Sequence, residues 1–408
     1  MIHWLTAWVL LLQLGGTPAV DKNSLQTLAQ TALKKVERMR GQVLSAPLKM
    51  GVKSRAEILT FVTSRLSQEY GPEKVKAEGW LLKDQGFLSH DIDYGQLVSE
   101  LLSEQIAGFY DHTRQELHIA DWLGAAVQEP VMAHEIFHAI QDQEWGGGRL
   151  LDSKRFNHDQ ILAHAALLEG DATIVMLNYS SGADMSTSAM TINMVAASLP
   201  MQMSSNQFPT MAKAPLYLKQ SLIFPYQQGL LFVSALRQSG LSWTKIREVY
   251  KDPPRSTEQI LHPKKYYSNR DHPSSVELPD NLIPGFKVRW SGATGEFHAR
   301  QLLLQKLPTT DAISGAEGWD GDQTVVLSDG ARHVSLTYSV WDSVDDARDF
   351  AKKLRQVVQG AKKSRSGAAV HSHLQQTNDI VVYAFSKDGE LSRKAVKLAL
   401  KTAKVERR

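Results

Sequence analysis

Two histidines lie four residues apart in the stretch 131–142, VMAHEIFHAIQD, and a glutamate directly follows the first. Residues four apart on an α-helix lie one above the other, so the rings of His134 and His138 could both reach one metal ion. Glu135 lies about 100° further round the helix axis. From there its carboxylate could touch a metal-bound water without sharing the ion, which is the arrangement that metal-assisted hydrolysis needs.

The surrounding sequence predicts the helix that this spacing requires. Apolar residues recur with the period of a helix and form one stripe: Ala133, Ile136, Phe137 and Ile140. Pro130 is expected at the first helical position, where its missing N–H costs nothing. The glycines at 146–148 are expected to end the helix.

A catalytic zinc site also needs a third protein ligand and an open fourth position. The next predicted helix, Phe156–Leu177, offers four candidates: His158, His164, Glu169 and Asp171. His164 points about 140° away from Glu169 around the helix axis, and His158 lies about 16 Å from it along the axis. Only one of the candidates can therefore bind the ion, and we expect it to be Glu169.

Gly170 follows this glutamate inside the same predicted helix. A glycine there costs about 1 kcal/mol relative to alanine, which suggests that another segment comes close at this point. We expect that segment to be the helix of His134 and His138.

The order of these motifs resembles that of the gluzincin metallopeptidases, in which HExxH is followed by a downstream glutamate ligand. More narrowly, the chain resembles an uncharacterised group of bacterial proteins classed as metallopeptidases. The likeness rests on the segments EQIAGFYD (104–111), HEIFHAIQDQ (134–143), LLEGDAT (167–173) and PPRSTEQILHPKKY (253–266). It implies a zinc peptidase with a zincin-like catalytic domain, in which His134, His138 and Glu169 bind Zn2+ and Glu135 is the general base.

One departure from thermolysin-type gluzincins concerns the partner of a ligand histidine. Those enzymes carry an aspartate four residues after the ligand glutamate, where this chain has Thr173. Asp171 is the alternative candidate to hydrogen-bond a ligand histidine. Its position on the helix, pointing away from Glu169, argues against that role, so both possibilities stay open.

Composition limits the class of protein. The 408 residues are enough for two or more domains, and the net charge of +3 is too small to indicate nucleic-acid binding. Cysteine is absent, which excludes disulfides, thiolate zinc ligands and a cysteine nucleophile. The partner that we expect is a peptide or protein substrate.

The N-terminus predicts export. The apolar run Trp4–Leu14 is too short to span a bilayer but has the length of a signal-peptide core. The residues at 17–19, TPA, suggest cleavage after Ala19. Residues 1–19 are therefore assigned to a signal peptide, although no Lys or Arg precedes the run. The alternative is an uncleaved segment that anchors an exported protein to the membrane. We expect no further membrane span.

Residues 20–280 are expected to form the mostly helical catalytic domain. Its N-terminal helices, predicted over Ser24–Arg40, Arg55–Gln68 and Tyr94–Ile106, either pack on this domain or form a removable prosegment. A β-hairpin is predicted over Gly108–Asp121, which could bring His112 and His118 near the site. Seven of the 11 methionines fall between Met176 and Met211, where we expect them to fill an irregular core or to line the cleft.

Amide hydrolysis also needs a hydrogen-bond donor for the oxyanion that develops in the transition state. The downstream segments offer four candidates: Tyr226, His262, Tyr266 and Tyr267. In gluzincins of the thermolysin type a histidine from a late segment does this, and in the M1-type aminopeptidases a tyrosine does. The resemblance therefore implies His262 as the donor, with one of the tyrosines as the alternative.

A proline-rich stretch at 270–284 separates a second domain, predicted over 285–405. A first helix is expected over 295–307. Strands at 323–327 and 333–340, a helix at 342–358, strands at 368–373 and 379–385, and a helix at 390–403 are expected to follow. Two strands and a helix, repeated, predict a ferredoxin-like α+β domain, and the whole chain is therefore assigned to the α+β class.

Three functions are compatible with these residues. The first is an exported zinc peptidase, and the second is a zinc-dependent hydrolase that acts on a non-peptide substrate. The third is a zinc-bearing binding protein without activity, in which Glu135 would be an ordinary polar residue of the helix.

Overall fold

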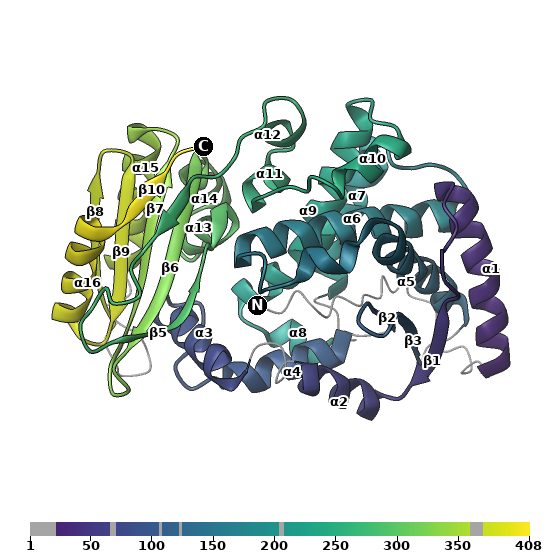
Figure 1. Ribbon diagram of the computed structural model, residues 1–408, viewed down its shortest axis with the longest axis horizontal. Helices are drawn as coiled ribbons and strands as arrows, with labels where there is room; N and C mark the ends of the chain where they lie inside the picture. The colour runs from purple at the N-terminus through teal and green to yellow at the C-terminus, as the bar shows by residue number, and fades with distance from the viewer. Residues whose placement is uncertain (1–21, 66–70, 106–107, 122–124, 204–207, 360–369) are drawn as a thin grey trace.

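The structure is a computed structural model that describes residues 22–65, 71–105, 108–121, 125–203, 208–359 and 370–408. The predicted signal peptide lies outside the described residues. Figure 1 shows two parts side by side, a mostly helical part and a five-stranded sheet covered by helices. The predicted α+β class is confirmed.

The helical part contains the candidate site. Its elements are α1 (Lys22–Arg40), β1 (Lys49–Lys53), α2 (Arg55–Arg65), α3 (Pro72–Asp84), α4 (Tyr94–Gln105), β2 (Gly108–Asp111), β3 (Glu116–Ala120), α5 (Ala125–Trp145), the 3-10 helix η2 (Gly147–Leu151), α6 (His158–Ser181), α7 (Ala189–Met203), α8 (Pro209–Lys213), α9 (Leu216–Gln238), α10 (Trp243–Val249), α11 (Thr257–Leu261) and α12 (Lys264–Tyr267). The short strand β4 (Ser275–Glu277) follows, and its Val276 packs in the core of the C-terminal part. The order predicted for this part, helices followed by a hairpin and two long helices, is present.

Helix α6 forms the centre of the helical part. Asn157 and Gln160 make a capping box at its start, and Gly182 ends it in the left-handed conformation with φ 73°. By length and composition α6 is the one described helix that could cross a membrane, but 89% of its most apolar 18-residue stretch is buried inside the protein. That burial is typical of a core helix.

Helices α6 and α9 touch backbone to backbone. A Cβ atom added at Gly170 would lie 2.1 Å from the carbonyl carbon of Gly229, and one added at Gly229 would lie 2.0 Å from the oxygen of Ala166. The expectation that Gly170 makes room for the histidine helix is therefore wrong. The glycine admits α9, which carries Tyr226 toward His134.

The histidine helix, α5, begins at Ala125 and not at Pro130, which lies inside it. It ends at Trp145 as predicted, because Gly146 takes the left-handed conformation with φ 70°. Helix α1 packs against α5 through a shared core that includes Val36, Ile136 and Phe137. The N-terminal helix therefore belongs to the folded body of the protein.

A small sheet lies beside α5, with strand order β1-β3-β2. Strands β2 and β3 form the predicted hairpin, and Gln115 in its turn has a positive φ of 53°. Strand β1 pairs in parallel with β3, which the sequence did not predict. As a result β2 is an edge strand of this sheet.

The C-terminal part contains β5 (Lys287–Gly292), α13 (Gly295–Leu304), α14 (Thr309–Ala316), β6 (Trp319–Ser328), β7 (His333–Trp341), α15 (Val344–Gln359), β8 (His371–Thr377), β9 (Ile380–Ser386), α16 (Gly389–Thr402) and β10 (Lys404–Glu406). Its antiparallel strands follow the order β5-β6-β7-β9-β8. Strands β6 to β9 are neighbours in the same order as the four strands of the predicted ferredoxin-like sheet. The chain begins this sheet at a different strand, as in a circular permutation. Strand β5 is added at one edge.

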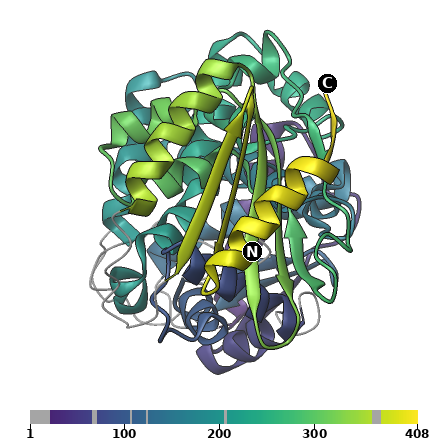
Figure 2. The ribbon, with the colours of Figure 1, turned by 90° about the vertical axis from the view of Figure 1, so that its left-hand side faces the viewer.

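The helices of this sheet lie on opposite faces, whereas a ferredoxin-like domain packs both on one face. Val382 and Ala384 of β9 point toward α16, which crosses the front of the sheet in Figure 2. Tyr383 and Phe385 point the other way, into a core shared with α15 and the helical part. Helix α16 leads to β10, which pairs with β4 outside this sheet, so it makes no crossover within the sheet.

The contact between α6 and α9 gives a direct test of the packing. Replacing Gly229 with alanine should lower the free energy of unfolding by about 3 kcal/mol or more, because the added methyl group meets backbone atoms that cannot move aside. Urea denaturation measures this change. The matched control is Gly95→Ala in α4, where the added methyl group meets a side-chain methyl of Val75 at 3.3 Å and no backbone atom. Equal midpoints for Gly229→Ala and the wild type would contradict the backbone contact.

Candidate metal centre

The structure brings three sequence-predicted ligands together. The Nε2 atom of His134 lies 3.0 Å from the Nε2 atom of His138 and 3.1 Å from the Oε2 atom of Glu169. The His138 Nε2 atom lies 3.4 Å from the same carboxylate oxygen. The two histidines come from successive turns of α5 and the glutamate from the middle of α6, as the spacing predicted.

These distances fit a tetrahedral ion. A zinc ion bound to imidazole nitrogens at 2.0–2.1 Å separates neighbouring ligand atoms by about 3.3 Å. The three separations in the structure bracket this value. Two imidazole nitrogens and a carboxylate oxygen that converge on one point are ligand types that Zn2+ accepts, so the donor set suits a divalent metal.

The electrostatics of the cluster also suit a cation. Burial would by itself raise the pKa of Glu169, but the charge of His138 and hydrogen bonds from both histidines lower it to about 2. Burial would likewise lower the pKa of His138, but the Glu169 carboxylate raises it to about 9. Burial lowers the pKa of His134. At neutral pH the glutamate is therefore ionised, and metal binding would release the proton of His138.

Each histidine ring also makes a hydrogen bond on the side that faces away from the ligand cluster. The Nδ1–H group of His138 donates to the Oε1 atom of Gln141 at 2.6 Å. His134 has a hydrogen bond with the backbone of Ala172. A ring that donates from Nδ1 offers the lone pair of Nε2 to a metal, so these two bonds select the tautomer that can coordinate.

Glu135 lies beside the three ligand atoms. Its carboxylate is fully buried and comes within 4.8 Å of the ligand nitrogens of His134 and His138. Its Oε2 atom accepts the backbone N–H of Tyr110 at 3.1 Å, from the edge strand β2. Glu169 makes the closer approach to both rings, which favours it as third ligand and leaves Glu135 the position of a base.

A small pocket of about 50 Å³ opens onto this cluster. His138 and Glu169 are among the residues that line it, together with Tyr110, His112 and Asp142. Burial raises the pKa of Asp142, which accepts hydrogen bonds from the Tyr110 hydroxyl and from the Gly148 N–H. The pocket has room for water-sized groups next to the candidate ligands.

The structure does not bring His262 to this cluster, which corrects the expectation that it stabilises an oxyanion. Its Nε2 atom bonds to Glu296 at 3.0 Å. His262 directly follows the short helix α11, whose first residue, Thr257, bonds to Asp159 in the first turn of α6. Asp159 is ten residues before Glu169, about 15 Å along that helix. Of the four candidates it is Tyr226 that lies near the site, with its ring centroid 6.3 Å from that of His134.

The segment PPRSTEQILHPKKY instead joins the two parts of the protein. His262 holds Glu296 of α13, and the Lys265 ammonium lies within 3 Å of carboxylates of Glu258, Asp271 and Asp342. The Lys265 ammonium is therefore the cation that these three carboxylates share.

The other histidines singled out from the sequence have separate positions. His112 lines the pocket, whereas His118 lies on β3 with its ring against Phe109. His164 donates to the carbonyl of Leu150, and its burial lowers its pKa to about 4. His164 is therefore a structural residue, as the helix geometry predicted.

Several methionines lie where the sequence did not place them. Met190, Met194 and Met201 of α7 are 80%, 63% and 72% exposed. They fill no core and do not line the pocket described above, whereas Met176 and Met211 are buried.

Asp171 does not contact a ligand histidine directly. It accepts the Tyr250 hydroxyl, and Tyr250 in turn accepts the amide of Gln141, the partner of His138. Gln141 was missed in the sequence, although its position three residues after His138 puts it on the same helix face.

Comparison with known proteins identifies one part of the chain. Residues 288–398 match a family described as a domain of unknown function, DUF8575. This match covers most of the five-stranded sheet and its helices and none of the candidate ligands. No curated protein and no solved structure matches the chain.

The ligand set can be tested by metal content. Purified protein should carry about one zinc per chain, and His138→Ala should lose most of it because two ligands hold a catalytic zinc weakly. The matched control is His164→Ala, which removes another buried histidine of the neighbouring helix. Elemental analysis of dialysed samples measures both. If His164→Ala loses the zinc and Glu169→Ala keeps it, then the third ligand is not Glu169.

A second test concerns Gln141. Gln141→Met keeps the volume of the side chain but removes the acceptor that holds the His138 ring. Zinc affinity should fall by about 10–100-fold, the range found when such a partner is lost. Competition with a chromophoric chelator measures the affinity, with Gln143→Met on the same helix as control. An unchanged affinity would mean that the ring needs no such partner.

Proposed function

We propose that this protein is an exported zinc-dependent peptidase. The observation that carries the proposal is the convergence of His134, His138 and Glu169 within 3.4 Å, with the Glu135 carboxylate beside them. A binding protein that used zinc only for its structure would need no buried carboxylate next to an open coordination position. Export rests on the apolar run Trp4–Leu14 and is proposed from the sequence alone.

The roles of the residues follow from their positions. Zinc, when bound, would polarise the substrate carbonyl and acidify water at the open position. Glu135 takes a proton from the attacking water and delivers it to the leaving amine. The backbone N–H of Tyr110 holds the Glu135 carboxylate toward the ligands. The ring of Tyr226 lies on the His134 side and Tyr110 lines the pocket, so a tyrosine hydroxyl is the donor that we propose for the oxyanion.

The pocket sets a condition on the substrate. A pocket of about 50 Å³ has room for the reacting carbonyl group. A polypeptide substrate would lie across its mouth, near the edge strand β2. The same size is the observation that favours the second candidate, a zinc-dependent hydrolase of a small ester or amide.

The Glu135→Gln variant tests the proposal. The amide is nearly isosteric, so zinc content and melting temperature should stay at wild-type values. Because it cannot accept a proton, turnover should fall by at least about 100-fold. Zinc content, melting temperature and cleavage of a peptide library are measured on the same sample.

Glu129→Gln, on the same helix, is the matched control and should keep full activity, since Glu129 bonds to Tyr179 outside the ligand cluster. Full activity of Glu135→Gln with full zinc would contradict catalysis by this helix. Wild-type cleavage of small esters without cleavage of peptides would favour the second candidate.

A further inference from the structure

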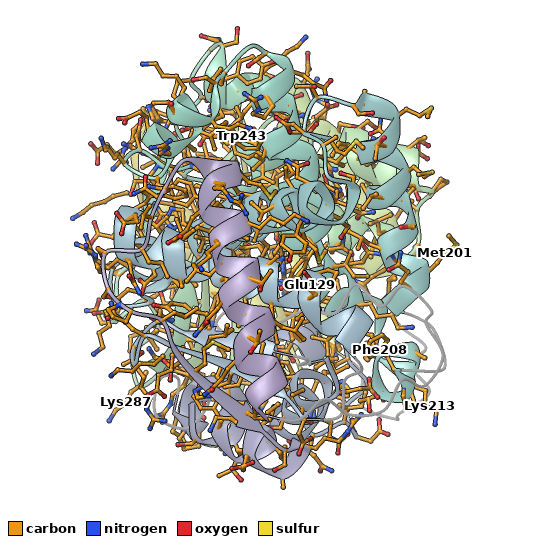
Figure 3. All side chains as sticks on the ribbon, turned by 90° about the vertical axis from the view of Figure 1, so that its right-hand side faces the viewer. Glu129, Met201, Phe208, Lys213, Trp243 and Lys287 are labelled. Carbon is orange, nitrogen blue, oxygen red and sulfur yellow. The ribbon has the colours of Figure 1, made fainter. Side chains whose placement is uncertain are left out.

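A buried ion pair links the N-terminal helix to α6. Arg40, the last residue of α1, donates to both carboxylate oxygens of Asp171, at 2.5 and 3.0 Å. The two side chains are 2% and 0% exposed. Two aromatic rings flank the guanidinium, those of Phe137 and Trp243, at 4.4 and 4.0 Å. Figure 3 shows Trp243 at the end of α1.

From Asp171 a chain of hydrogen bonds leads to a candidate ligand. The Tyr250 hydroxyl donates to Asp171 at 2.8 Å. Gln141 donates its amide to the Tyr250 oxygen at 2.8 Å and to the Leu168 carbonyl at 2.9 Å. His138 donates to the Gln141 oxygen at 2.6 Å.

The ion pair at the start of this chain fixes the direction of every bond in it. A carboxylate paired with a guanidinium accepts, so Tyr250 donates to Asp171 and its oxygen is left to accept from Gln141. The Gln141 oxygen then faces His138, which donates from Nδ1. The His138 Nε2 atom is therefore the one directed at the point shared with His134 and Glu169.

Arg40 holds the Asp171 carboxylate in place as the acceptor of this chain. Its guanidinium donates to both carboxylate oxygens, and the Tyr250 hydroxyl donates to one of them. Without these paired bonds the carboxylate could turn away from Tyr250, and Tyr250 would no longer hold Gln141 in one orientation.

We infer that α1 is part of the metal centre and that Arg40 is a positioning residue, which orients His138 through Asp171, Tyr250 and Gln141. This inference rests on the proposed function, since it assigns the purpose of the chain to a ligand. It also decides between the two roles considered for the N-terminal helix. Removal of α1 would leave Asp171 buried without its cation, so α1 is not a removable prosegment.

Tyr250→Phe tests the chain with little disturbance. The phenyl ring keeps its packing against Trp145, 4.9 Å away, and only the hydroxyl that joins Asp171 to Gln141 is lost. Zinc affinity should fall by about 10-fold, the lower end for such partners, since Leu168 still holds Gln141. Tyr179→Phe, which removes the hydroxyl that bonds to Glu129, is the matched control and should bind zinc like the wild type.

Arg40→Lys tests the start of the chain. Lysine keeps the charge but cannot make the paired bonds or the flat contacts of the guanidinium, so zinc affinity should again fall by about 10-fold. Arg38→Lys, an exposed position of the same helix, is its control.

A second measurement needs no metal. In metal-free protein the His138 Nδ1–H group should give a slowly exchanging proton signal by NMR, assigned by its loss in His138→Gln. Its exchange should be at least several-fold faster in Tyr250→Phe and Arg40→Lys. In the control variants Tyr179→Phe and Arg38→Lys the exchange should stay at the wild-type rate, which separates the loss of this chain from a general loss of stability.

Wild-type zinc affinity and wild-type exchange in both variants would overturn the inference. A wild type that binds no zinc would contradict the proposed function, and the exchange of the His138 signal would still decide whether Arg40 orients the ring.

Discussion

The structure depends on one buried carboxylate. Glu169 lies in the middle of the core helix α6, 2% exposed, with two imidazole rings directed at it. A buried anion without a cation is costly, so this position must hold either a proton on a histidine or a metal ion. The pKa values of the cluster favour the ionised glutamate, and the distances suit an ion coordinated by all three side chains.

Three helices that pack around Glu169 position the other residues of the candidate site. Helix α5 supplies the histidines and Glu135, and its other face packs on α1. Helix α9 reaches α6 through Gly170 and Gly229 and carries Tyr226 toward the histidines. Helix α1 ends at Arg40, whose pairing with Asp171 gives the chain of bonds to His138 a fixed direction. Local helix geometry and long-range contacts therefore agree on one orientation of the ligands.

The parts of the site that follow from helical period could be predicted from the sequence. The spacing of His134 and His138 put both rings on one face, and elimination along the next helix chose Glu169 over His164. Gly170 correctly indicated a close approach, but a glycine does not say which segment approaches. His262 was placed wrongly, because nothing local distinguishes a histidine that holds Glu296 from one that faces a substrate. Arg40 and Tyr250 lie 131 and 79 residues from Asp171, beyond any periodic pattern.

The fold, like the site, could be predicted from the sequence only where local patterns determine it. The sequence pattern predicted four of the five strands of the C-terminal sheet, β6 to β9, whose neighbour order is ferredoxin-like, but it did not predict β5. The apolar stripe of a helix such as α16 shows that one side is buried but not which face of a sheet it covers. That choice was decided by the helical part, which occupies the opposite face.

The most direct test of the account is the position of the metal. Crystals soaked in zinc should give one strong anomalous diffraction peak in the helical part. We predict that it lies about 2.0–2.2 Å from the Nε2 atoms of His134 and His138 and from a carboxylate oxygen of Glu169. No peak there, or a peak bound by other side chains, would contradict the account.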